Sequence, residues 1–68
     1  MLNMIDWFAH VRIKETGITG IVVDIHTVKG IERFEVESDE KGTPGGFGDD
    51  DSWKLYGCVE SELEVIEE

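Results

Sequence analysis

The fold of this chain is decided by residues 11–25, which read VRIKETGITGIVVDI. Apolar and basic side chains alternate over residues 11–14, and this two-residue period is typical of a half-buried strand, which we place at residues 8–14. The pattern then breaks at Gly17 and Gly20, which we expect to flank a tight turn because glycine tolerates positive φ. The chain is therefore predicted to reverse direction here.

The second half of this stretch predicts another strand. Four of the five residues 21–25 are β-branched, which favours extended backbone. Strand alternation would place Ile21, Val23 and Ile25 on one face.

Alternation returns further along the chain. Residues 27–30 read as a hairpin connection, and residues 32–37 follow as a third strand with Phe34 and Val36 on one face. Residues 53–58 resume a strand pattern with aromatic side chains. The chain thus contains at least four strand-like segments.

The two ends of the chain are less regular. Residues 64–66 can form a short last strand, and residues 59–63 are too short for a stable α-helix, so we expect a single 3₁₀ turn there. Residues 2–7 are compatible with a frayed tail, a short helical turn or a strand.

Residues 38–52 differ from the rest in composition. They contain four glycines, one proline and five acidic residues, and Phe47 is their only large apolar side chain. Such a segment has little to bury, so we predict a long, mobile acidic loop. The acids at 49–51 lack the alternating spacing of a calcium loop, which favours a solvated loop over a metal site.

Five short strands in 68 residues predict one all-β domain covering residues 1–68. At this size a small closed or half-closed barrel limits exposed edges. The 3₁₀ turn before the last strand is compatible with an SH3-like barrel.

Two parts of the sequence resemble known proteins. Residues 11–25 resemble the opening of KOW-type and related small SH3-like barrels, in which a strand, a glycine turn and a G-x-V-x-x-I strand follow one another. Residues 53–66 resemble the end of small SH3-like proteins of bacteria, phages and mobile elements. The resemblance implies a five-stranded barrel and, in ribosomal and transcription-factor members, contact with RNA or protein.

The charge is strongly negative and unevenly distributed along the chain. Six basic residues stand against sixteen acidic residues, giving a net charge of −10, and residues 35–68 carry all of it. This charge argues against general binding to nucleic acid or to anionic membranes. The chain also has no apolar run of membrane-spanning length and a single cysteine, so we expect a cytoplasmic protein without a membrane segment.

No pattern in the sequence indicates catalysis. The serines lack a G-x-S-x-G context, and His10 and His26 have no third ligand at metal spacing. Cys58 has no basic neighbour in sequence, so we expect a buried, unreactive thiol. We therefore expect a non-enzyme without a metal ion or other cofactor.

Aromatic residues are the first candidate interaction site. Trp53 and Tyr56 have opposite parity in their strand, so one of them should lie outside, and Phe47 sits in a polar loop. Exposed aromatics beside a loop can form a peptide-binding groove. The alternative is that Phe47, Trp53 and Tyr56 only cover the open end of the barrel.

Basic residues of the neutral half are the second candidate site. The residues Arg12, Lys14, Lys29 and Arg33 could gather into a basic patch that contacts phosphates. The alternative is that they form cross-strand ion pairs with Asp24, Glu32 and Glu35.

These features give two functional hypotheses. The first is a non-catalytic protein-interaction module, an acidic SH3-like barrel that binds a protein partner as a monomer or weak dimer. The second is a KOW-type nucleic-acid-associated module that uses the basic patch. Mimicry of a nucleic acid by the acidic face is a third reading, based on charge alone.

Overall fold

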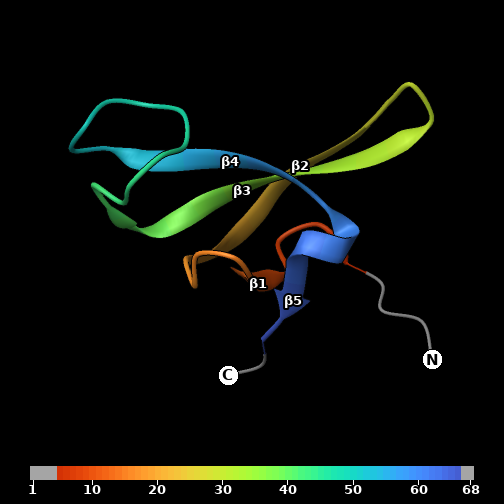
Figure 1. Ribbon diagram of the computed structural model, residues 1–68, viewed down its shortest axis with the longest axis horizontal. Helices are drawn as coiled ribbons and strands as arrows, with labels where there is room; N and C mark the ends of the chain where they lie inside the picture. The colour runs from red at the N-terminus through yellow and green to blue at the C-terminus, as the bar shows by residue number, and fades with distance from the viewer. Residues whose placement is uncertain (1–4, 67–68) are drawn as a thin grey trace.

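The computed structural model describes residues 5–66 and contains five β-strands and one 3₁₀ turn. In chain order these are β1 (His10–Ile13), β2 (Thr19–Val28), β3 (Ile31–Lys41), β4 (Trp53–Val59), the 3₁₀ turn η1 (Glu60–Glu62) and β5 (Leu63–Val65). In Figure 1 the β2–β3 hairpin and the β3–β4 loop project from opposite ends of the molecule. The expected all-β fold with a 3₁₀ turn before the last strand is confirmed.

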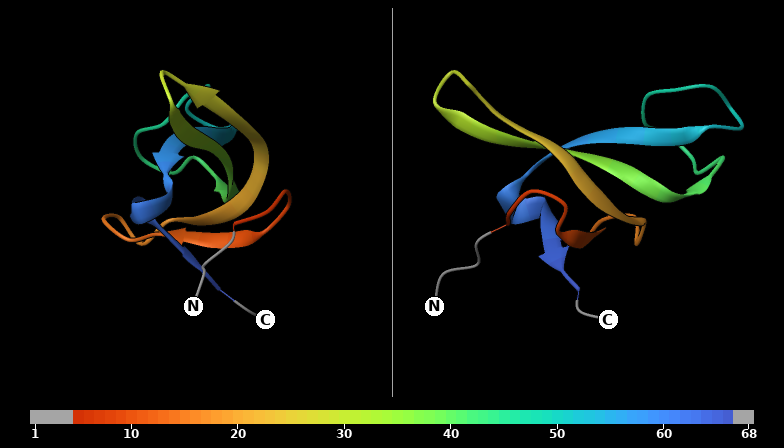
Figure 2. Two further views of the ribbon diagram at one scale, coloured as in Figure 1. Left: turned by 90° about the vertical axis from the view of Figure 1, so that its right-hand side faces the viewer. Right: turned by 180° about the vertical axis from the view of Figure 1, so that it is seen from behind.

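All five strands belong to one antiparallel sheet with the order β4-β3-β2-β1-β5. The first and last strands of this order are its edges, and no pairing between β4 and β5 is recorded within residues 5–66. Figure 2 shows β2 as a long curved ribbon that passes from beside β1 to beside β3. The structure therefore shows a strongly curled sheet that is not closed into a barrel.

The core lies inside this curl. Phe34 and Val36 of β3 are buried, as their shared parity predicted. They are joined by buried side chains from the other strands and from the segment before β1, namely Ile5, Val11, Ile13, Val22, Cys58 and Leu63. A core this small draws on every strand of the sheet.

A β-bulge at Val23 changes the alternation of β2. Val22 is fully buried, yet Ile25, three residues later, also packs against the core. The pairing of β2 with β3 shifts by one residue between them, and an extra residue reverses which face the following side chains occupy. The prediction that Ile21, Val23 and Ile25 share one face is therefore wrong.

Gly20 lies within β2 rather than in the turn. A Cβ at this position would overlap the carbonyl oxygen of Glu37 and lie 2.8 Å from Cγ1 of Val36. Glycine is therefore required by the close approach of β3. The turn itself uses Gly17, whose φ is +80°.

Several strand limits differ from those expected, and the β2–β3 connection is residues 29–30 instead of 27–30 because Thr27 and Val28 pair with β3. β1 begins at His10 instead of at residue 8, because Phe8 adopts a φ of 64°, which is incompatible with extended backbone. β3 continues to Lys41, so the first four residues of the expected 38–52 loop belong to a strand. The connection between β3 and β4 is thus residues 42–52.

Candidate functional site

The β3–β4 loop, residues 42–52, is attached to β4 by two side chains of that strand. Lys54 is buried, and its Nζ donates two hydrogen bonds of 3.1 and 3.2 Å to loop carbonyl oxygens. The Tyr56 hydroxyl donates one of 2.6 Å to a third. The acceptors are the carbonyls of Thr43, Pro44 and Gly45. The start of the loop is therefore held against β4 by hydrogen bonds. The mobility expected for the whole loop stays a prediction.

A buried hydroxyl supports the same region. Ser38 lies where the pairing of β3 with β4 becomes irregular. Its hydroxyl accepts the backbone N–H of Lys54 at 3.1 Å and donates to the carbonyl of Glu40 at 2.7 Å. The Ser38 hydroxyl therefore replaces the backbone carbonyl that would accept the Lys54 N–H in a regular strand pair.

Phe47 is held in place by its backbone while its ring projects into solvent. Its N–H donates to the carbonyl of Leu55 at 2.7 Å, and its carbonyl accepts the N–H of Leu55 at 2.9 Å. Gly46 and Gly48 on either side both have positive φ. Phe47 as a residue nevertheless remains 80% exposed. A large apolar ring is thus presented from a backbone fixed to the sheet.

The other two candidate aromatics have different surroundings. Tyr56 packs against the core, whereas Trp53 is 51% exposed and stacks under the Lys41 ammonium, 4.4 Å from the ring centroid. The prediction that one of Trp53 and Tyr56 lies outside is confirmed. Tyr56 also fixes the loop, so its hydroxyl has a structural role.

Phe47 and Tyr56 meet at a cavity of about 360 Å³. The β1–β2 turn, the β3–β4 loop, β4 and η1 all contribute to its wall. Its apolar lining includes Ile13, Phe47, Leu55 and Tyr56, and Glu15 and Glu62 supply acidic side chains. Trp53 is not part of this lining. The structure therefore brings two of the three candidate aromatics to one hollow with acidic neighbours.

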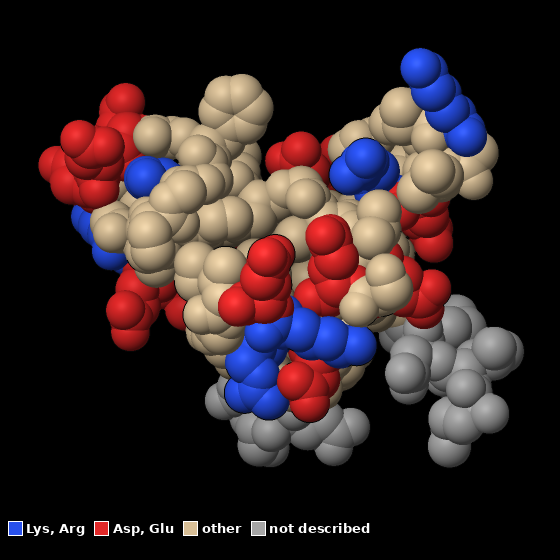
Figure 3. All heavy atoms as spheres, in the orientation of Figure 1, with Lys and Arg blue, Asp and Glu red and all other residues tan. Residues whose placement is uncertain are grey.

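The four candidate basic residues do not lie at one place. Arg12 is opposite Thr19, and Arg33 is opposite His26, seven residues further along β2. Seven strand residues span about 23 Å. Lys29 lies further still, at the turn between β2 and β3. In Figure 3 the Lys and Arg side chains form separate groups, with Asp and Glu between them.

The ion pairs are also not those expected. Arg12 pairs with Glu64 of β5 at 3.0 Å, and Asp24 pairs with His26 of its own strand at 3.3 Å. Within the described residues, no ion pair is recorded for the other three basic candidates. The partner of Arg12 thus comes from a strand that is distant in sequence.

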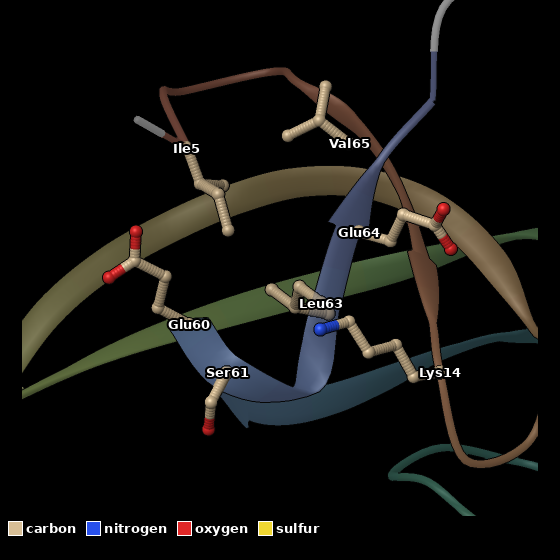
Figure 4. Close-up of a pocket in the computed structure, with 7 residues that line it drawn as sticks. All are labelled: Ile5, Lys14, Glu60, Ser61, Leu63, Glu64 and Val65. Carbon is tan, nitrogen blue, oxygen red and sulfur yellow. The ribbon is translucent and has the colours of Figure 1, made fainter. Parts of the chain in front are cut away.

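Lys14 borders a second cavity, of about 600 Å³. Figure 4 shows its side chain reaching past Leu63, with Glu60, Ser61 and Glu64 around the same hollow. Acidic residues outnumber the single lysine here. This hollow is therefore a poor place for a phosphate group.

Asp39 at the end of β3 connects three strands. Its Oδ2 lies 2.6 Å from Nε2 of His10 and accepts the Thr19 hydroxyl at 2.8 Å. Burial acts to raise the pKa of Asp39, but the hydrogen bonds from His10 and Thr19 and the charge of His10 together lower it below its ordinary value. The carboxylate is therefore a structural acceptor for β1 and β2.

The Cys58 thiol is buried, as expected. Burial, and secondarily the negative charge of Glu62, raise its pKa to about 11, although Arg33 acts in the opposite direction. Because the thiolate is the reactive form, this environment suppresses nucleophilic chemistry.

One exposed aromatic pair lies outside the sites expected from the sequence. Trp7 and Phe8 precede β1 with ring centroids 6.4 Å apart, and Phe8 is 71% exposed at a positive φ. The sequence predicts a strand over residues 8–14, which includes Phe8. Nothing local signalled the positive φ.

Comparisons with protein-family models, with curated proteins and with solved structures found no match to this chain. In the described part of the chain, no three His, Cys, Asp or Glu side chains are arranged to bind a metal ion. Among residues 5–66, no helix has the length and apolar character required to cross a bilayer.

Proposed function

We propose that this chain is a non-catalytic protein-interaction module of SH3-like architecture, which contacts a protein partner through Phe47 and the cavity beside it. The observation that carries the proposal is the exposed Phe47 ring on a backbone fixed by two hydrogen bonds to Leu55. A residue whose backbone is already fixed loses less conformational freedom on binding, which favours its use as an anchor.

The SH3-like part of the proposal is supported by the order of the strands. β4 and β5 lie at opposite edges of the sheet, yet only the short turn η1 separates them in sequence. The sheet must therefore curl until its edges approach, which is the geometry from which a small barrel closes. Figure 2 shows this curl along β2.

The negative charge of the chain favours a partner with a basic surface. A net charge of −10 repels phosphate backbones and steers the molecule toward basic protein surfaces. The nucleic-acid alternative gains no support from the wide separation of Arg12 and Arg33. It remains a hypothesis, which a salt-dependent titration with RNA and DNA would test.

Partner recovery by matched variants tests the proposal. Tagged wild-type protein, Phe47→Ser and Ile31→Ser are compared, because Ile31 is also an exposed apolar residue (53%) but lies at the β2–β3 hairpin. This hairpin and the β3–β4 loop project from opposite ends of the molecule (Figure 1). We expect a partner recovered in stoichiometric amount by wild type and Ile31→Ser, and reduced at least about tenfold by Phe47→Ser. Equal recovery by Phe47→Ser, or no partner with wild type, contradicts the proposal.

A further inference from the structure

One part of the outer edge of β4 is unpaired. Leu55 exchanges two backbone hydrogen bonds with Phe47, so its N–H and C=O point away from β3. Backbone groups alternate in direction along an antiparallel strand, so Gly57 points its N–H and C=O the same way. Gly57 is exposed, and within the described residues no hydrogen bond is recorded at this outer side. The next outward N–H, that of Val59, already donates to Oε1 of Glu62 at 2.9 Å.

The β3–β4 loop leaves this edge after a single bridge. Continued antiparallel pairing beyond Phe47 would place Gly45 opposite Gly57. Instead, Gly45 and Gly46 have φ of +71° and +70°, and the carbonyl of Gly45 is held by Lys54. The loop therefore turns away and leaves the edge at Gly57 uncovered.

The surroundings of this edge specify what fits it. The cavity beside Gly57 presents the apolar side chains of Ile13 and Phe47 and the acidic side chains of Glu15 and Glu62. A strand laid along Gly57 would bring its side chains close to both the apolar lining and the two acids of this cavity. A segment that contains both apolar residues and lysine or arginine complements the apolar and the acidic side chains of this cavity.

We propose that the β4 edge at Gly57 binds an extended, basic segment of a partner protein, which adds to the sheet as a further strand. This inference rests on the proposed interaction function and names its binding mode and the chemistry of its partner. Backbone hydrogen bonds at Gly57 supply the alignment, and side chains in the cavity supply selectivity. A second copy of this chain fits less well, because two molecules of charge −10 repel each other.

Synthetic peptides provide the probe. A blocked peptide of about seven alternating valines and lysines is titrated into isotope-labelled protein to about 1 mM, and amide shifts and hydrogen exchange are followed by NMR. Two control peptides each change one property of this peptide. One carries glutamate in place of lysine, which reverses its charge. The other is N-methylated along its whole backbone, which removes its N–H donors. We expect the first peptide to shift the Gly57 amide and slow its exchange, and both controls to bind at least about tenfold more weakly.

Two variants test the same edge from the protein side. Gly57→Pro removes the outward N–H, which an edge strand tolerates, whereas Gly57→Ala retains it and places its Cβ in open space. We expect peptide binding by Gly57→Pro to be about tenfold weaker than binding by Gly57→Ala, which carries a side chain at the same position but keeps the N–H. If Gly57→Pro fails to fold, the N-methylated peptide still decides the question.

Four results would overturn the inference. These are no response of Gly57 to the valine–lysine peptide, equal binding of the N-methylated peptide, equal binding of the glutamate peptide, and protection of Gly57 by self-association in the absence of peptide. The partner-recovery experiment distinguishes failure of strand addition at Gly57 from failure of the proposed interaction function. If Phe47→Ser loses the partner but a folded Gly57→Pro retains it, strand addition at Gly57 is contradicted. The proposed interaction function is then still supported.

Discussion

At Gly20 the backbones of β2 and β3 approach so closely that the position has no room for a side chain. The nearest obstacle to a Cβ is a backbone carbonyl oxygen, that of Glu37, which cannot rotate away as a flexible side chain would. Gly57 is the opposite case, because a Cβ there would meet nothing within 4 Å. The two glycines share a sheet but differ in what surrounds them.

We predict that Gly20→Ala destabilises the protein by about 1–3 kcal/mol, because the strands must separate to admit the methyl group. Gly57→Ala serves as the control and should leave the free energy of unfolding unchanged or slightly raised, since alanine restricts the unfolded chain more than glycine does. Urea denaturation of the three proteins measures both effects. Equal stability of Gly20→Ala and wild type would contradict the close approach.

At the level of elements, the β2–β3 hairpin shows how a turn sets a register. Val28 pairs with Ile31, so only Lys29 and Gly30 form the loop. Their φ angles are 53° and 80°, both positive, as in the mirror-image turn whose twist matches that of the strands. Glycine adopts this conformation freely, whereas lysine is disfavoured there. Lys29 therefore occupies a turn position whose positive φ is unfavourable for lysine.

We predict that Lys29→Asn stabilises the protein by about 0.5–1 kcal/mol, because asparagine adopts positive φ more readily and Asn-Gly is the preferred pair for this turn. Lys29→Val should destabilise it, since a β-branched side chain is poorly tolerated at positive φ. Thermal unfolding of both variants provides the measurement. A Val variant at least as stable as the Asn variant would exclude this turn geometry.

For the whole molecule, folding redistributes the charge that the sequence separates. β1 belongs to the neutral half of the chain but lies beside β5 of the acidic half. Arg12 therefore pairs with Glu64 of β5, and His10 contacts Asp39 of β3, which also belongs to the acidic half. These contacts leave the net charge at −10, and Figure 3 shows acidic side chains spread across the visible face. The folded state is thus subject to repulsion among its acids.

We predict that moderate salt stabilises the fold. Raising the salt concentration from about 10 mM to about 100 mM shortens the Debye length from about 30 Å to about 10 Å, which screens repulsion between distant carboxylates. At pH 7 the melting temperature should rise by about 5 °C, equivalent to about 1 kcal/mol for a domain of this size. Near pH 4, where carboxylates become protonated, the effect should largely disappear. A melting temperature that falls with salt at pH 7 would show that attractive ion pairs outweigh the repulsion.

The sequence by itself determined the all-β class, the approximate positions of five strands, the 3₁₀ turn and the buried face of β3. These features follow from local periodicity and local chain length, which neighbouring residues encode directly. Of the candidate site, it identified Phe47 as an aromatic without obvious burial and placed either Trp53 or Tyr56 outside.

Only the tertiary structure decided the rest, because each remaining feature depends on residues distant in sequence. The bulge at Val23 is visible only against β3, and Phe47 becomes a fixed anchor only through its bonds to Leu55. The separation of Arg12 from Arg33 likewise follows from the register across β2. Periodicity indicates which way a side chain points within its own strand, but packing decides which strand it meets.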